Sequence, residues 1–213
     1  MGLQLVPRVA AAAIVALLVS ALAHAEDNMR VSSQELKAKT DYCKTCHGLQ
    51  GQGYRGSLPM PRLAGQKPEY SENQLKAFIE HRRNAAAFSH AHELSPAMLT
   101  AVTTEFEKLN PKPLGGAPTD QIEAGKKIYD EGVPDQNIQA CASCHGPEAK
   151  GDGQAARLAG QLYDYVTDEL TNWDKGRGQN TANPEASAIM QTIAQDLTPA
   201  QIAAVAAYVS TLE

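Results

Sequence analysis

The chain has 213 residues, of which 20% are charged, and its formal net charge is −5 at pH 7. A mildly acidic protein lacks the basic face that nucleic-acid binding requires, so no nucleic-acid partner is expected. The whole chain contains only 3 phenylalanines and 1 tryptophan. Such a low aromatic content limits the apolar core that small domains can build by themselves.

Residues 1–25 have the features of a secretory signal peptide. Arg8 precedes an apolar run over residues 9–22, and Ala23-His24-Ala25 forms a small-x-small cleavage site. The apolar run is shorter than the ~20 residues that a membrane-spanning helix needs. We therefore predict cleavage after Ala25, a periplasmic mature protein of formal charge −6, and no stable membrane insertion after cleavage.

The rest of the chain is an internal duplication. A C-x-x-C-H-G motif at residues 43–48 recurs at 141–146, and Arg-Leu-Ala-Gly-Gln at 62–66 recurs at 157–161. Further matches at equal offsets from the two glutamines are Tyr70 with Tyr165, Leu75 with Leu170, Phe78 with Trp173 and Arg82 with Arg177. A unit of about 95 residues occurring twice indicates a duplicated small domain. We predict domain 1 at 26–109, a linker rich in proline and glycine at 110–118, and domain 2 at 119–213.

The expected secondary structure is helical in both copies. First helices are expected near residues 33–43 and 119–130. Closing helices are expected to begin at Ser95-Pro96 and Thr198-Pro199, with the hydroxyl residue as N-cap and proline at the first helical position. Thr198 and Gln201 also fit a capping box. The apolar stripes of these two helices are Leu99, Val102, Phe106 and Leu109, and Ile202, Val205, Val209 and Leu212. Strand signals are nearly absent, so we predict an all-α protein of two small domains.

The two C-x-x-C-H motifs predict covalent attachment of haem. Residues i, i+3 and i+4 lie on one face of a helix, so two thiols can bond one haem while the imidazole reaches its iron. We therefore predict two covalently bound haem c groups, with His47 and His145 as the proximal iron ligands. The thioether bonds are assigned to Cys43 and Cys46, and to Cys141 and Cys144. Each porphyrin would also supply the apolar slab that the small domains lack.

Four cysteines in an oxidising compartment are also compatible with disulfides, a shared zinc site or a redox-active pair. A zinc ribbon usually separates its pairs by roughly 15 to 20 residues, whereas 94 residues lie between Cys46 and Cys141. A redox-active pair of the thioredoxin type needs a βαβ context, which the sequence lacks. The histidine directly after each pair favours haem over these alternatives.

On these residues the chain resembles the class I dihaem cytochromes c, in particular the cytochrome c4 group. The resemblance covers about residues 33–213, and the carrying segments are the two C-x-x-C-H-G motifs, the two Leu-Ala-Gly-Gln segments, Gln74-Leu75 and Tyr208. It implies two tandem class I cytochrome c domains related by a pseudo-twofold axis, acting as a periplasmic electron carrier. It also implies that Pro61 and Ala156 lie near the proximal histidines, and that Arg62 and Arg157 lie near haem propionates.

The distal iron ligand is expected to differ between the copies. The resemblance places the distal methionine of haem 2 at Met190, seven residues before Leu197. The same offset before Leu94 falls on Ala87, which cannot bind iron. Met60 lies on the expected proximal side and Met98 lies inside the closing helix, so neither is well placed.

The first copy instead contains three histidines in this region, namely His81, His90 and His92. We predict that His90 is the distal ligand of haem 1, with His92 and His81 as alternatives. A bis-histidine haem 1 beside a His/Met haem 2 would have the lower potential, because methionine ligation raises haem potentials. Electrons would then pass from domain 1 to domain 2.

The predicted function is a periplasmic dihaem cytochrome c that relays electrons between redox partner proteins, such as a membrane oxidoreductase and a terminal oxidase or reductase. No catalytic residue is predicted, since the sequence contains no nucleophile array, phosphate-binding loop or additional metal cluster.

The alternative function is a dihaem redox enzyme or enzyme subunit, which would be peroxidase-like or would oxidise sulfur compounds, with an open or unusual site at haem 1. Dihaem peroxidases are considerably longer, and the distal cysteine of dihaem thiosulfate dehydrogenases has no counterpart here. A cytochrome subunit of a larger complex is the third interpretation.

Overall fold

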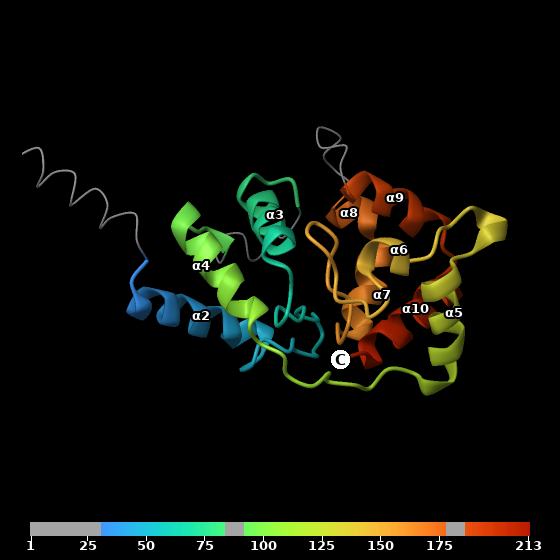
Figure 1. The fold of residues 1–213 in the computed structure, drawn as a ribbon, viewed down its shortest axis with the longest axis horizontal. Coiled ribbons are helices and arrows are strands. Elements are labelled where there is room, and N and C mark those ends of the chain that lie inside the picture. Colours follow the sequence, from blue (N-terminus) through green and yellow to red (C-terminus); the bar gives the residue numbers. More distant parts are fainter. Residues whose placement is uncertain (1–30, 84–91, 178–185) are drawn as a thin grey trace, which may run out of the picture.

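A computed structural model describes residues 31–83, 92–177 and 186–213. The predicted signal peptide at 1–25 and His90 lie outside these described residues. The described residues form two helical halves that lie side by side, and an extended segment runs along the base of both (Figure 1). Residues 109–118 of this segment have no regular secondary structure.

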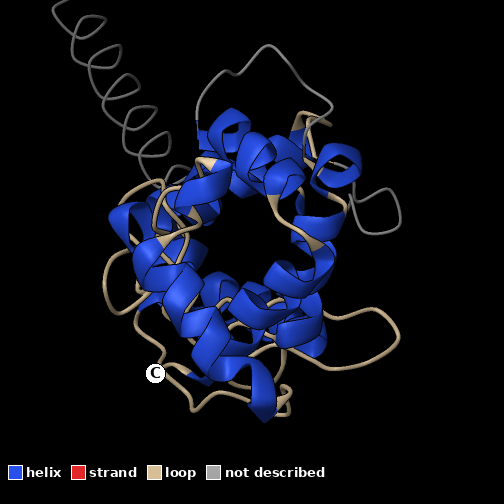
Figure 2. Ribbon diagram, turned by 90° about the vertical axis from the view of Figure 1, so that its right-hand side faces the viewer, coloured by secondary structure: helices blue, strands red, loops and turns tan. Residues whose placement is uncertain are grey.

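The helices of each half pack around its closing helix. In the first half, α4 (Pro96–Glu107) contacts α2 (Ser33–His47) and α3 (Pro68–Ile79). In the second half, α10 (Pro199–Thr211) contacts α5 (Ile122–Glu131) and α7 (Tyr163–Thr171). The remaining helices of the second half are α6 (Ala142–His145), α8 (Trp173–Gly176) and α9 (Ala186–Asp196), with 3-10 turns at Thr119–Gln121 and Pro134–Gln136. The part of the chain that the structure describes contains isolated β-bridges but no strand (Figure 2). The all-α prediction is therefore confirmed.

Both closing helices begin where their caps predict. The Ser95 hydroxyl accepts a hydrogen bond from the Met98 amide at 3.3 Å. The Thr198 hydroxyl accepts from the Gln201 amide at 3.3 Å, and the Gln201 side chain accepts from the Thr198 amide at 2.8 Å, which completes the capping box. Most of the predicted apolar stripes are buried, namely Leu99, Val102 and Phe106 in α4 and Ile202, Val205 and Val209 in α10.

The helices that precede the attachment motifs differ between the two halves. Helix α2 runs without a break through His47, so it is longer than the predicted 33–43. In the second half, α5 ends before Gly132, whose φ of 73° favours glycine. A loop containing Pro134 then leads to the short helix α6, which carries the second motif. The single helix α2 of the first half thus corresponds to two helices, α5 and α6, in the second half. The loop between them contains Gly132 and Pro134, which interrupt the helix.

Gly125 allows α5 and α10 to approach closely. A Cβ atom at this position would lie 1.9 Å from the carbonyl oxygen of Ala204. Replacing glycine by alanine in a helix normally stabilises it by about 1 kcal/mol, but here the two backbones would have to separate. We expect Gly125→Ala to destabilise the protein by about 1–3 kcal/mol, measured by urea unfolding.

Gly176→Ala is the matched control, because a Cβ at Gly176 would meet no atom within 4 Å. Since no clash opposes the helix propensity of alanine at this position in α8, the variant should keep the unfolding midpoint or raise it, by up to about 1 kcal/mol of stability. Equal effects of the two substitutions would contradict the packing explanation.

Candidate functional site

The two C-x-x-C-H motifs present free thiols next to a histidine. Cys43 and Cys141 are partly buried, whereas Cys46 and Cys144 are exposed, and none of the four forms a disulfide. Burial raises the pKa of the Cys141 thiol to about 11 and also raises the pKa of Cys43. Among the described residues, no group of three or more histidine, cysteine or acidic side chains could hold a metal ion. The first pair lies on α2 in the first half and the second pair lies at α6 in the second half, so each half has its own attachment motif.

Each motif's histidine is oriented by a backbone carbonyl. Nδ1 of His47 lies 2.9 Å from the Pro61 oxygen, and Nδ1 of His145 lies 2.7 Å from the Ala156 oxygen. A carbonyl can only accept, so Nδ1 carries the proton and Nε2 keeps its lone pair. Burial lowers the pKa of both imidazoles, which favours this neutral form. A neutral imidazole held in this way is suited to bind haem iron through Nε2.

The carbonyls that orient the histidines lie on equivalent loops. Pro61 and Ala156 immediately precede the two Arg-Leu-Ala-Gly-Gln segments. The Gly65 amide donates to the Phe106 carbonyl at 2.9 Å, and the Gly160 amide donates to the Val209 carbonyl at 2.9 Å. Each loop is therefore anchored to the C-terminal end of its closing helix. The expected proximity of Pro61 and Ala156 to the two histidines is confirmed.

Two glutamines connect the halves reciprocally. The side chain of Gln66 accepts from the Arg157 amide at 2.6 Å and donates to the Arg157 carbonyl at 3.1 Å. The side chain of Gln161 accepts from the Arg62 amide at 2.8 Å and donates to the Arg62 carbonyl at 3.1 Å. Both glutamines are buried, with 6% of their surface exposed. These four hydrogen bonds hold the two loops in one arrangement related by approximate twofold symmetry.

The side chains of Arg62 and Arg157 lie beside these bonds and are also buried. Both guanidinium groups donate to the side-chain oxygen of Asn110, at 3.2 and 3.3 Å. Burial and the charge of Arg157 lower the pKa of Arg62 to about 10. In the described part of the chain, neither arginine forms an ion pair with a carboxylate. Two buried cations of this kind fit the anionic propionate groups that the sequence resemblance places beside them.

A second set of buried charges lies between the halves. Arg83, from the first half, donates to the Glu169 carboxylate at 2.7 Å and to the Tyr165 hydroxyl at 2.8 Å. Arg177 pairs with the other Glu169 oxygen and donates to the hydroxyls of Tyr70 and Tyr165, at 2.8 and 2.9 Å. Burial raises the pKa of Glu169, but the two arginines outweigh it and hold that pKa at about 2. A single carboxylate thus joins two guanidinium groups from different halves.

The structure corrects one prediction from the internal repeat. Equal spacing matched Arg82 with Arg177, but Arg83 is the counterpart of Arg177. Arg83 lies over the Phe78 ring at 4.6 Å, as Arg177 lies over the Trp173 ring at 4.8 Å. Arg82 instead pairs with Glu80 at the surface. His81 has a φ of 55°, and this left-handed residue adds one position to the turn after α3.

Of the predicted distal ligands, the structure describes Met190, His81 and His92 but not His90. Met190 lies on α9 and is partly buried. The His92 ring stacks on Phe78, with 4.3 Å between ring centroids, whereas His81 is exposed. Met60 pairs with Tyr54 through backbone hydrogen bonds directly before Pro61, which is the proximal side of the first motif. The assignment of His90 remains a prediction, because that residue is outside the described part.

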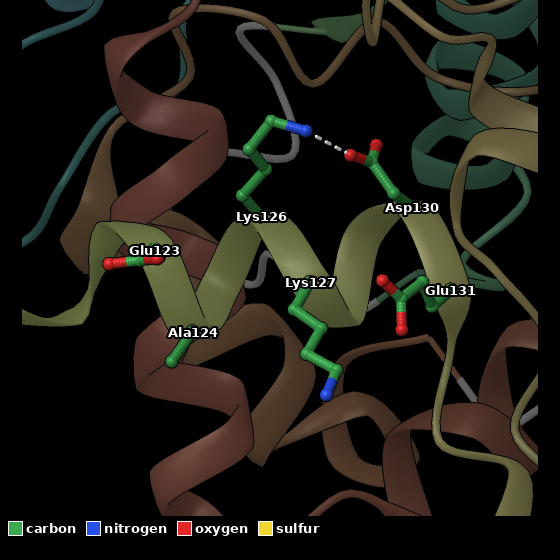
Figure 3. A pocket seen from close by; sticks show the side chains of 6 residues that line it. All are labelled: Glu123, Ala124, Lys126, Lys127, Asp130 and Glu131. Atoms are coloured by element: carbon green, nitrogen blue, oxygen red, sulfur yellow. Dashed lines mark hydrogen bonds and ion pairs between the residues drawn. The ribbon is translucent and has the colours of Figure 1, made fainter.

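A surface hollow on the outer side of α5 is unrelated to these sites. It is lined by six residues, namely Glu123, Ala124, Lys126, Lys127, Asp130 and Glu131. Figure 3 shows that these side chains project from one helix, with Lys126 paired to Asp130. Such i, i+4 charge pairs are typical of a solvated helix face.

Sequence reasoning missed the roles of Gln66, Gln161 and Glu169. The identity of Arg-Leu-Ala-Gly-Gln in both copies was a usable signal for the two glutamines. Glu169 aligns with Gln74 in the first copy. This change from a neutral to a charged residue was the sequence signal for the ion pairs that Glu169 forms with Arg83 and Arg177.

The family model described as cytochrome c matches residues 34–112 and 122–213, one stretch for each half. The chain belongs to the cytochrome c family. Within it, this chain is a class I dihaem cytochrome c of the cytochrome c4 type, and it carries two covalently bound haem c groups. The sequence-based predictions of family, fold and cofactor are thereby confirmed.

Three similar proteins illustrate the relationship. Cytochrome c-552 of Acidithiobacillus ferridurans is 37% identical over 80% of this chain and 73% of its own length. A thiosulfate dehydrogenase electron acceptor of Thiomonas intermedia is 34% identical, covering 79% of this chain and 77% of its own. The solved structure of Acidithiobacillus ferrooxidans cytochrome c4 has a TM-score of 0.66 and 35% identity, covering 81% of this chain and 99% of its own. This cytochrome is accordingly a dihaem electron carrier.

No helix among the described residues is long and apolar enough to cross a membrane.

Proposed function

We propose that this cytochrome relays electrons in the periplasm between two redox partner proteins, with one haem receiving electrons and the other delivering them. The observation that carries the proposal is the reciprocal bonding of Gln66 and Gln161 across the halves. These bonds involve the loops whose carbonyls orient His47 and His145. Two redox centres held in one arrangement are suited to passing an electron from one to the other.

The haem groups supply one-electron chemistry, and the chain's residues attach and orient them. Cys43 and Cys46, and Cys141 and Cys144, would form the thioether bonds. His47 and His145 would bind the two irons through Nε2, since Nδ1 is committed to a carbonyl. Met190 would be the distal ligand of haem 2. His90 would be the distal ligand of haem 1, with His92 and His81 as alternatives.

We also propose that residues 1–25 are a signal peptide removed on export, and that 26–109 and 119–213 are domains joined by a linker at 110–118. Mass spectrometry of protein matured in a haem-ligating periplasm should find a polypeptide beginning at Glu26 with two haems attached. A retained leader would contradict the predicted cleavage.

The donor class is suggested by the Thiomonas intermedia relative, whose name describes an electron acceptor of thiosulfate dehydrogenase. We propose a donor that oxidises sulfur compounds, with this cytochrome accepting its electrons.

The enzyme alternative, with an open haem 1 that reacts with a small molecule, requires an exchangeable iron site. Carbon monoxide distinguishes the two functions: a relay with both irons six-coordinate should not bind it rapidly when reduced. Rapid, stoichiometric binding at one haem would favour an enzyme.

The His90 assignment predicts two separated redox centres. Spectroelectrochemical titration should resolve a lower-potential haem 1 and a higher-potential haem 2, because only haem 2 has methionine ligation. In His90→Ala, the near-infrared bands of the oxidised bis-histidine haem should be lost and carbon monoxide should bind haem 1. His92→Ala serves as the matched variant. Loss of those bands in His92→Ala alone would move the assignment to His92, and two haems titrating together at high potential would exclude bis-histidine ligation.

A further inference from the structure

Each proximal histidine is connected to a glutamine of the opposite half through one peptide group. In the second half, the Ala156–Arg157 peptide accepts from Nδ1 of His145 through its oxygen, at 2.7 Å. The amide of the same peptide donates to the Gln66 side chain at 2.6 Å. The Pro61–Arg62 peptide does the same in the first half, between Nδ1 of His47 at 2.9 Å and Gln161 at 2.8 Å.

The two chains of hydrogen bonds therefore cross between the halves. Gln66 belongs to the first half and acts on the peptide of His145, while Gln161 belongs to the second half and acts on the peptide of His47. Both glutamines are buried, so water does not compete for these bonds. Each glutamine oxygen also accepts from the amide of the next residue, Lys67 or Leu162, at 3.0 Å, which fixes its orientation.

We propose that Gln66 and Gln161 are positioning residues, each of which tunes the proximal histidine of the opposite haem through this shared peptide group. When the glutamine oxygen accepts the amide proton, it polarises the peptide and makes its carbonyl a stronger acceptor. A stronger acceptor draws the Nδ1 proton of the histidine and makes Nε2 a better electron donor to iron. Electron donation favours the oxidised iron, so the bond lowers the potential of that haem. The inference rests on the proposed ligation by His47 and His145.

The test is a crossed pair of variants, Gln66→Met and Gln161→Met, made in the full-length haem-loaded protein. Methionine keeps the length and approximate volume of glutamine but cannot make these hydrogen bonds. At a fixed applied potential, Gln66→Met should increase the ratio of reduced to oxidised haem 2 by about threefold, or about 30 mV at 59 mV per tenfold. Gln161→Met should do the same to haem 1. In each variant the haem of the glutamine's own half should stay nearly unchanged.

A residue-specific readout supports the assignment. In the reduced protein, nuclear magnetic resonance of the Nδ1 protons should show a weaker hydrogen bond at His145 in Gln66→Met and at His47 in Gln161→Met. Asn73→Ala is the matched control, because the Asn73 side chain bonds Gln154 across the halves at 3.0 Å without contacting either peptide. It should change neither potential.

Each outcome is decisive. A shift at the haem of the same half, equal shifts at both haems, or an equal shift in Asn73→Ala would overturn the inference and indicate general loosening of the interface. Absence of two six-coordinate haems in the unmodified protein would instead refute the proposed function, and absorption spectra separate that result from the first.

Discussion

Replacing Glu169 with glutamine is expected to destabilise the contact between the two halves by about 3–5 kcal/mol. The substitution keeps the shape of the side chain but removes the single negative charge that joins Arg83 and Arg177. These arginine side chains are only 12% and 9% exposed, so water cannot replace the lost partner. Two like charges would then lie buried together. Chemical unfolding followed by circular dichroism should show a lower free energy of unfolding for Glu169→Gln. Limited proteolysis near residues 109–118 should also be faster in this variant.

Glu80→Gln provides the control for this prediction. Glu80 also pairs with an arginine, Arg82, but its side chain is 55% exposed. Surface ion pairs contribute about 0–1 kcal/mol, so this variant should unfold almost like the original protein. Equal losses in the two variants would mean that burial of the Glu169 charge is not what stabilises the interface.

The same carboxylate predicts a dependence of stability on pH. The folded-state pKa of Glu169 is about 2, below its ordinary value of 4.5. The stabilisation is therefore complete above about pH 4.5 and is lost as the pH falls toward 2. The Glu169→Gln variant should lack this part of the acid transition.

Replacing both Cys141 and Cys144 with serine is expected to remove one haem and leave the other. Thioether attachment needs the thiols of one motif, and the two motifs lie in separate halves, so haem 1 should still attach at Cys43 and Cys46. The mass should fall by one haem, and the Soret absorbance should fall by about half. His145 is buried and would lose the iron that it is proposed to bind, so the second half should also lose thermal stability.

The reciprocal variant, with serine at positions 43 and 46, is the control and should retain haem 2 alone. The two single-haem proteins also report the potential of each centre directly. The protein retaining haem 1 should titrate at the lower potential if His90 is its distal ligand. Loss of both haems from either variant would show that attachment at one site depends on the other.

Much of the fold followed from local sequence. The caps at Ser95 and Thr198 and the apolar stripes of the closing helices predicted α4 and α10, because capping and helical periodicity depend on residues a few positions apart. The attachment motifs predicted the haems for the same reason, since their chemistry lies within five consecutive residues. The first helix of the second half was predicted well, since the expected 119–130 corresponds to the 3-10 turn Thr119–Gln121 followed by α5. The first helix of the first half was predicted too short, because α2 continues through the attachment motif to His47.

The sequence by itself determined that this chain is a duplicated, helical, haem-attaching protein. Only the tertiary structure decided how the copies act on each other: that Gln66 and Gln161 bond the opposite loops, and that Arg83 rather than Arg82 reaches Glu169. These contacts join residues more than eighty positions apart. Their partners are set by the docking of two halves about an approximate twofold axis, which local pattern and spacing do not encode.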